Sequence, residues 1–169
     1  MPARRLRPGS SKIRAADDAE ATRVAAVALL ARRDFTSREL SERLIEQGFG
    51  EAMAVSVVTE LLRQGVLDDG RYAQNYVAYH AGRGQGPVRI AAELRRRGLA
   101  PELVEAALAG GPDWPALARK VCRAKFGLQP PASWAERARQ ARFLQYRGFS
   151  SDHIRAVTGA EPETGSTDL

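Results

Sequence analysis

Arginine supplies most of the side chains in this chain that could bind a ligand. Guanidinium groups suit phosphates and carboxylates, and aromatic rings between them can stack on the bases of single-stranded nucleic acid. Arginines near a helix C-terminus also complement the helix dipole, and their stems can cover apolar surface, so a purely structural role is equally compatible. The candidate partner- or DNA-binding residues are Arg71, Arg83, Arg89, Arg95, Arg96, Arg97, Arg142, Tyr146 and Arg147.

Two further motifs could be mistaken for catalytic or phosphate-binding sites. The segment 82–87 is rich in glycine, but it lacks the Lys-Ser/Thr pair of a phosphate loop. We therefore expect a flexible basic loop there. Asp68 and Asp69 have no third acidic or histidine ligand nearby. One of these two aspartates is therefore expected to cap a helix.

The remaining reactive side chains indicate no active site. His80 and His153 have no catalytic partners, and Cys122 lies in an apolar helical pattern and is expected in the core. A single cysteine excludes an intrachain disulfide, and two histidines are too few for a Cys/His zinc site. The sequence therefore predicts no enzyme activity, no cofactor and no metal.

The charge balance favours a polyanionic partner. The chain has 169 residues, 44% of them hydrophobic, with 26 Lys+Arg against 20 Asp+Glu and a net charge of +6. Arginine-rich composition is also typical of GC-rich genomes, so basicity alone does not establish such a partner. No apolar run approaches the ~20 residues of a membrane span, and the N-terminus lacks a secretory apolar segment. We expect a cytoplasmic monomer with no membrane partner.

A repeat organises these residues. Gly48, Gly98 and Gly148 stand fifty residues apart, a period typical of helical repeats. Leu44 and Phe49 flank the first glycine at the offsets of a Schellman helix C-cap, in which glycine takes a positive φ. Equivalent apolar residues flank the other two, so the three glycines are predicted to be structural C-caps.

Hydrophobic spacings of three and four indicate helices throughout and no convincing strand. The predicted fold is all-α, with three tandem three-helix repeats forming an elongated, curved array. The repeats cover residues 15–66, 67–112 and 113–159. Residues 1–14 are expected to form a disordered basic arm, and residues 160–169 a loose acidic tail.

Capping patterns mark several helix starts. Thr36 and Glu39 form a capping box, and Ser133 and Glu136 repeat it. Pro87 suits the first position of a helix. The first helix of each repeat is expected to bury an apolar face, whose members are Val24, Val27 and Leu30, then Tyr72, Tyr76 and Tyr79, then Trp114, Leu117 and Val121.

Charge is unequal among the repeats. The first has six basic and nine acidic residues, net −3, the second six and five, net +1, and the third nine and three, net +6. The gradient favours different partner surfaces at the two ends, although ordinary variation of solvated faces would also produce it.

Two local sequences are similar to the signatures of the RecX family. The central one is Leu67-Asp68-Asp69-Gly70-Arg71-Tyr72-Ala73 followed by Gly86-Pro87-x-x-Ile90-x-x-Glu93-Leu94-x-x-x-Gly98, and the C-terminal one is Arg142-Phe143-Leu144-x-Tyr146-Arg147-Gly148-Phe149. The resemblance runs from about Ala19 to Val157. It implies a non-enzymatic, all-helical regulator of the recombinase RecA. Such proteins bind RecA and its filament on single-stranded DNA, hinder filament extension, and damp ATPase, strand exchange and SOS coprotease activity.

The charge gradient suggests how such a regulator would be oriented. We hypothesise that the basic third repeat, with Arg142 and Arg147, lies nearer DNA or an acidic RecA face, and that the acidic first repeat meets a basic surface. Weak direct DNA binding is also expected. The alternative is a stand-alone helix-turn-helix DNA-binding protein, although no repeat shows a polar, base-reading third helix. A generic helical scaffold is a third interpretation.

Overall fold

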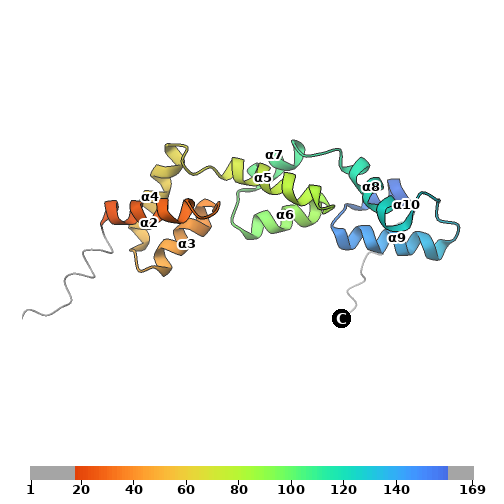
Figure 1. Cartoon of the computed structure of the whole chain (residues 1–169), viewed down its shortest axis with the longest axis horizontal. Helices are drawn as coiled ribbons and strands as arrows, with labels where there is room; N and C mark the ends of the chain where they lie inside the picture. The colour runs from red at the N-terminus through yellow and green to blue at the C-terminus, as the bar shows by residue number, and fades with distance from the viewer. Residues whose placement is uncertain (1–17, 160–169) are drawn as a thin grey trace, which may run out of the picture. The chain divides into compact units, whose positions relative to one another are not determined.

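The structure, a computed structural model, describes residues 18–159 and contains only helices and turns within that range (Figure 1). This confirms the all-α helical repeat fold. None of the helices between residues 18 and 159 combines the length and apolar character that crossing a membrane requires. In chain order the helices are α2 (Ala19–Leu30), α3 (Ser37–Glu46), α4 (Glu51–Arg63), α5 (Asp69–Gly82), α6 (Pro87–Arg96), α7 (Pro101–Ala109), α8 (Trp114–Phe126), α9 (Trp134–Arg147) and α10 (Ser151–Thr158). The arm predicted at residues 1–14 and the tail predicted at residues 160–169 lie outside the described residues.

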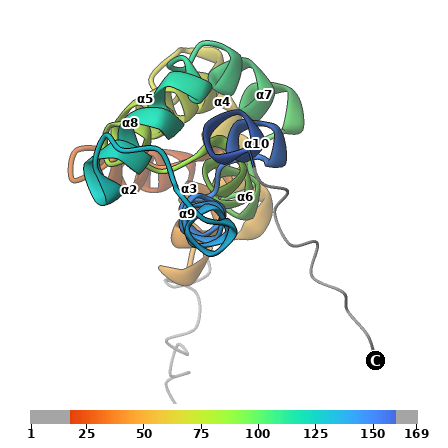
Figure 2. The same cartoon turned by 90° about the vertical axis from the view of Figure 1, so that its right-hand side faces the viewer.

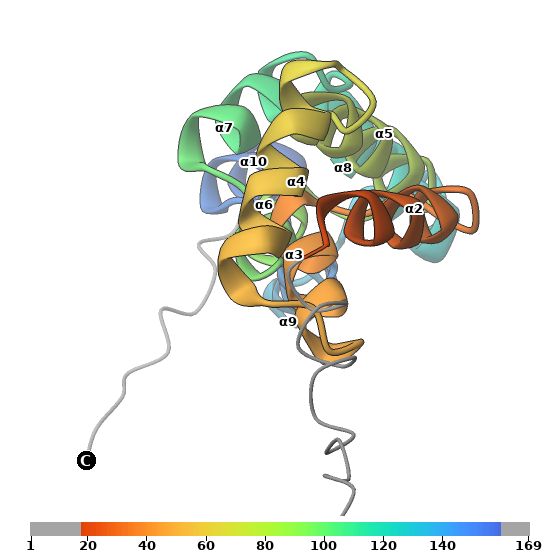
Figure 3. The same cartoon turned by 90° about the vertical axis from the view of Figure 1, so that its left-hand side faces the viewer.

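The chain divides into two compact bodies, an N-terminal body of residues 1–72 and a C-terminal body of residues 73–169. In the N-terminal body α2, α3 and α4 pack on one another around the wholly buried Leu40, Leu44 and Leu61 (Figure 3). In the C-terminal body α8, α9 and α10 pack together around Leu144 and Ile154 (Figure 2). Each three-helix group thus buries its own small core.

Glycine ends one helix of each group in the same way. Gly48, Gly98 and Gly148 have φ angles of 98°, 85° and 88°. After the first glycine, the Phe49 N–H donates to the Leu44 carbonyl at 3.2 Å, and the corresponding bonds after the other two measure 3.2 and 3.1 Å. This is the Schellman geometry. The apolar residue after each glycine is thereby turned back onto the helix that it follows.

The capping boxes differ between α3 and α9. Thr36 and Glu39 form both halves of a box at the start of α3. At α9 the Ser133 side chain accepts from the Glu136 N–H, but the Glu136 carboxylate accepts from the Ala132 N–H at 2.6 Å, one residue before the expected donor. The capping box predicted at α9 is therefore confirmed for Ser133 and wrong for the donor that Glu136 binds.

The neighbouring Asp68 and Asp69 accept hydrogen bonds from different helices. Asp68 caps α5 by accepting from the Arg71 N–H at 2.9 Å. Asp69 instead accepts from the N–H and the hydroxyl of Ser37, at 2.7 and 2.6 Å. Asp69 therefore fixes the start of α3 from 32 residues away, which local sequence could not indicate.

The apolar faces predicted for the first helices are only partly correct. Val24, Val27 and Tyr79 are 60%, 46% and 61% exposed, and the other members are half-buried. Of these, Leu30, Leu117 and Val121 pack against the cores of their three-helix groups. The wholly buried apolar residues of these helices are instead small, Ala26 in α2, Ala73 in α5 and Ala118 in α8.

The segment after α5 is not the flexible loop that its composition predicts. The Gly86 N–H donates to the Arg147 carbonyl at 2.8 Å, and the Val88 N–H donates to the Gly148 carbonyl at 2.9 Å. A Cβ on Gly86 would lie 2.3 Å from the Gly148 carbonyl carbon, and a Cβ on Gly148 would lie 2.2 Å from the Arg89 Cβ. The two glycines therefore form a direct backbone joint, here called the glycine joint, between α6 and α9.

Alanine substitutions at three glycines test this joint. Gly48→Ala adds a Cβ in open space at positive φ, so it should cost only the conformational strain, about 1–2 kcal/mol. Gly86→Ala and Gly148→Ala also force backbones apart and should cost at least about 3 kcal/mol. Urea unfolding followed by far-UV circular dichroism, which reports the helices of both bodies, measures the loss. A Gly86→Ala protein as stable as the parent would contradict the joint.

Candidate partner-binding surface

Most arginines at residues 18–72 are already paired. Arg63, for example, donates a hydrogen bond that lowers the pKa of Glu60 to about 2, and Arg23 bonds the side-chain oxygen of Gln64. Such exposed pairs add little stability, but they leave fewer cations available to a partner. The other pairs are Arg33 with Glu39 at 3.4 Å, Arg38 with Glu42 at 2.8 Å and Arg43 with Glu46 at 2.7 Å.

The cations of helix α8, in contrast, are unpaired in the described part of the chain. It carries Arg119, Lys120, Arg123 and Lys125 and no acidic residue. All four cations are exposed, and none forms an ion pair or side-chain hydrogen bond within residues 18–159. The buried side of α8 is formed by Ala118 and Cys122, so at 100° per residue Lys120 and Arg123 point away from the core. Arg119, Lys120 and Arg123 are here called the α8 cation surface.

Sequence reasoning missed the α8 cations as individual site residues, although it counted their charge. The information was present in the sequence. An arginine with glutamate three or four positions away tends to pair within its own helix, as Arg38 does with Glu42. Helix α8 offers no such acid, so its cations stay available.

The glycine joint brings together four of the predicted residues. The Arg147 guanidinium donates to the Arg83 carbonyl at 3.3 Å. The Arg89 guanidinium donates to the Tyr146 carbonyl at 3.4 Å and lies 5.8 Å from the centroid of the Tyr146 ring. Tyr146 is 78% exposed. These four residues form a basic and aromatic surface, here called the joint cluster.

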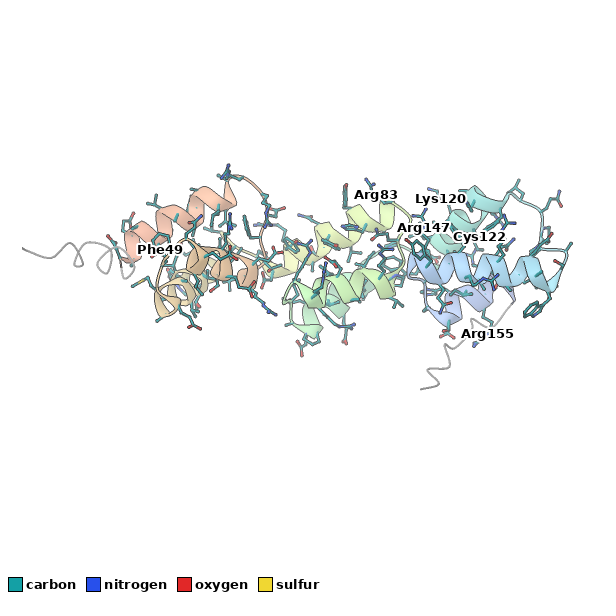
Figure 4. All side chains as sticks on the ribbon, turned by 90° about the horizontal axis from the view of Figure 1, so that it is seen from below. Phe49, Arg83, Lys120, Cys122, Arg147 and Arg155 are labelled. Atoms are coloured by element: carbon teal, nitrogen blue, oxygen red, sulfur yellow. The ribbon has the colours of Figure 1, made fainter. Side chains whose placement is uncertain are left out.

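The joint cluster continues toward α8. A Cβ on Gly84 would lie 3.0 Å from a Val121 methyl and 3.9 Å from an Arg147 guanidinium nitrogen. Figure 4 accordingly shows Arg83, Lys120 and Arg147 in the same region of the C-terminal body. The α5–α6 turn, α8 and the end of α9, each of which carries cations, thus meet at Gly84.

The remaining candidates are spread more widely. Arg96 and Arg97 pair with Glu93 at 2.7 and 3.2 Å, and the hydrogen bond from Arg96 holds the pKa of Glu93 below its usual value. Local pairing therefore accounts for two members of the arginine triplet, while Arg95 is exposed. The two other candidates, Arg142 on α9 and Arg71 on the first turn of α5 in the N-terminal body, are also exposed.

The two histidines and the cysteine are packed against neighbouring side chains of the fold. His80 stacks on Tyr76 with ring centroids 4.0 Å apart, and its Nδ1 lies 3.0 Å from the Gln85 side-chain oxygen. Burial lowers the pKa of His80 and of His153, and burial raises the pKa of the Cys122 thiol. Cys122 is buried, as predicted. Across residues 18–159, no group of His, Cys, Asp and Glu side chains could hold a metal ion.

Fold and surface together define an all-α protein of three-helix repeats with exposed cations on α8. The family descriptions "RecX, second three-helix domain" and "RecX, third three-helix domain" match residues 68–108 and 113–158. "Regulatory protein RecX" of Halorhodospira halophila is 46% identical over 145 residues, which cover 85% of this chain and 90% of that protein. The protein of the same name from Pseudomonas fluorescens is 40% identical over 139 residues, covering 82% and 90%. The chain belongs to the RecX family of regulatory proteins.

Solved structures agree on the fold. The crystal structure of RecX from Lactobacillus salivarius superposes with a TM-score of 0.73 at 21% identity, covering 84% of this chain and 95% of that one. A second crystal structure, of regulatory protein RecX, gives 0.71 at 22% identity, covering 95% and 81%. The matches to the family descriptions and to the relatives confirm the resemblance indicated by the two sequence signatures.

Lowering the pH from 7.5 to 5.5 should destabilise the C-terminal body. Burial depresses the folded-state pKa of His80 and His153 below the value of about 6.5 in an unfolded chain. The neutral imidazoles therefore contribute stability that is present above pH 6.5 and is lost as the pH falls through the lower folded pKa. Urea midpoints from tryptophan fluorescence should fall in the parent and fall less in a His80→Gln/His153→Gln variant. Equal pH dependence in both proteins would contradict the assignment.

Proposed function

We propose that this chain is a negative regulator of the RecA recombinase. It binds RecA and the RecA filament on single-stranded DNA, hinders filament extension, and thereby damps ATPase activity, strand exchange and SOS coprotease activity. It acts by binding and not by catalysis. The observation that carries the proposal is the unpaired α8 cation surface beside the joint cluster, since such a surface fits phosphates and exposed bases.

The distribution of ion pairs supports different binding surfaces for the repeats at residues 15–66, 67–112 and 113–159. The first repeat has a net charge of −3 and the third of +6. Pairing also affects which cations are available, because arginines of the first repeat are bonded to neighbouring glutamates whereas those of α8 are not. The third repeat therefore faces DNA or an acidic protein surface, and the first repeat faces a basic one.

Helix-turn-helix recognition of duplex DNA is less well supported. A base-reading helix needs side chains free to enter the major groove. The third helices of the repeats are α4, α7 and α10, and α7 contains no cation. Arg63 on α4 pairs with Glu60, and Arg155 on α10 pairs with Asp152. Direct DNA binding is therefore proposed to be weak and made through phosphates.

The DNA-dependent ATPase of RecA tests the proposal directly. We expect inhibition at a molar ratio of this protein to RecA well below one, because one blocked filament end or groove stops many subunits. The ATPase is followed while the protein is added to preformed filaments and, separately, before filament assembly. Tight, sequence-specific duplex binding with an unchanged ATPase would support the helix-turn-helix alternative instead.

A matched pair of charge variants tests the surface. Arg119→Gln/Lys120→Gln/Arg123→Gln removes three unpaired cations and should reduce the salt slope of oligo-dT binding by about 2, at roughly 0.7 per phosphate contact. Fluorescence anisotropy over a NaCl series measures this slope. The control removes three positive charges that are already paired, with glutamine substituted at Arg38, Arg43 and Arg63. Equal losses in both proteins would show that only net charge matters.

A further inference from the structure

We propose that the rings of Tyr79 and Tyr146 stack on the bases of single-stranded DNA, while Arg83 and Arg89 beside them bind the adjoining phosphates. The inference deepens the proposed function and rests on it in one respect, that this surface meets single-stranded DNA. It adds Tyr79 to the joint cluster, although the sequence spacing predicts that this ring is buried. Tyr79 and Tyr146 are here called the ring pair.

Exposure separates the ring pair from the other aromatic rings that have an arginine neighbour. Tyr79 is 61% exposed and Tyr146 is 78% exposed. Elsewhere in residues 18–159 arginines lie over the rings of Phe35, which is buried, and of Tyr76, Phe126 and Phe143, which are half-buried. A base needs an open ring face on which to stack. Among the rings with an arginine neighbour, the ring pair therefore offers the most accessible faces.

An arginine adjoins each ring without covering it. The Arg83 guanidinium donates to the Tyr79 hydroxyl at 3.2 Å and lies 5.6 Å from the centroid of the Tyr79 ring. Arg89 lies at a similar distance, 5.8 Å, from the centroid of the Tyr146 ring. Neither arginine forms an ion pair within residues 18–159, so several of the five N–H donors of each guanidinium stay available to a phosphate. Because these contacts already restrict the side chains, less rotamer freedom is lost when a ligand binds.

The glycine joint connects the two tyrosines through short contacts. Arg83 follows Tyr79 by four residues, and its carbonyl accepts from the guanidinium of Arg147 at 3.3 Å. Arg147 directly follows Tyr146 in α9. Figure 4 shows Arg83 and Arg147 in the same region of the C-terminal body. One strand can therefore meet both rings and the arginines associated with them.

Stacking on the ring pair predicts a preference for unpaired strands. The bases of a duplex already stack on one another, so a duplex presents mainly phosphates to Arg83 and Arg89. Every base has a π-face, and stacking on an aromatic side chain is therefore tolerant of sequence. The ring pair is expected to favour single strands over duplex DNA without selecting a sequence.

An abasic strand with the same number of phosphates as oligo-dT separates stacking from charge. In fluorescence anisotropy the full-length parent should bind oligo-dT at least about fivefold more tightly than the abasic strand, as one stacked base implies. Tyr79→Leu/Tyr146→Leu should bring this affinity ratio close to one. The salt slope of binding should stay unchanged, because no cation is removed.

Two further variants control for the loss of the tyrosines. Tyr79→Phe/Tyr146→Phe keeps both rings but removes the hydroxyls, and it should retain the affinity ratio of the parent. Trp134→Leu removes a ring that is 76% exposed and over which no arginine lies within the described residues. It should also retain the ratio. Far-UV circular dichroism checks that each variant is folded.

The outcomes separate this inference from the proposed function. An unchanged affinity ratio in the leucine variant of the ring pair, or a ratio near one in the parent, would overturn the stacking. If that variant lost inhibition of RecA at an unchanged ratio, the rings would contact protein, and the stacking would again be overturned. A ratio lost equally in Trp134→Leu would overturn the assignment to the ring pair. A ratio lost only with the ring pair would support stacking even if the parent left the RecA ATPase unaffected, in which case the proposed function alone would fail.

Discussion

The contact between Gly86 and Gly148 is the constraint on which the C-terminal body depends. Two backbone hydrogen bonds of 2.8 and 2.9 Å cross it, and neither glycine has room for a Cβ. Because main chain meets main chain there, α6 and α9 are held at a separation that ordinary side chains would prevent. The same contact sets the places of Arg83, Arg89 and Arg147, so the candidate surface is a direct consequence of the joint.

This geometry gives the family signatures a physical meaning. Gly86 belongs to the central signature and Gly148 to the C-terminal one, and the structure shows that the two form a single contact. Arg147 has a double role, because its guanidinium bonds the Arg83 carbonyl while remaining part of the basic surface. A substitution of Arg147 would therefore change packing as well as charge, whereas α8 cations can be altered without touching the core.

Ion pairing within helices decides where positive charge is available. The N-terminal body contains arginines, but α3 alternates them with glutamates at spacings of three and four, and they neutralise one another. Helix α8 lacks acidic residues and presents its charge outward. Local pairing leaves the net charge of each repeat unchanged, but it occupies the cations of α3 and leaves those of α8 available. The search for partners is therefore directed to the C-terminal body.

The sequence by itself determined the helical class, the family and the glycine-capped turns, because these depend on interactions between residues a few positions apart. Pro87 at a helix start and the Thr36 capping box are further examples. Tertiary structure alone decided which helix faces are buried, the attachment of Asp69 to Ser37, and the joint that packs the supposed loop against α9. Those features depend on contacts between residues far apart in the sequence, such as the close backbone approach of Gly86 to Gly148.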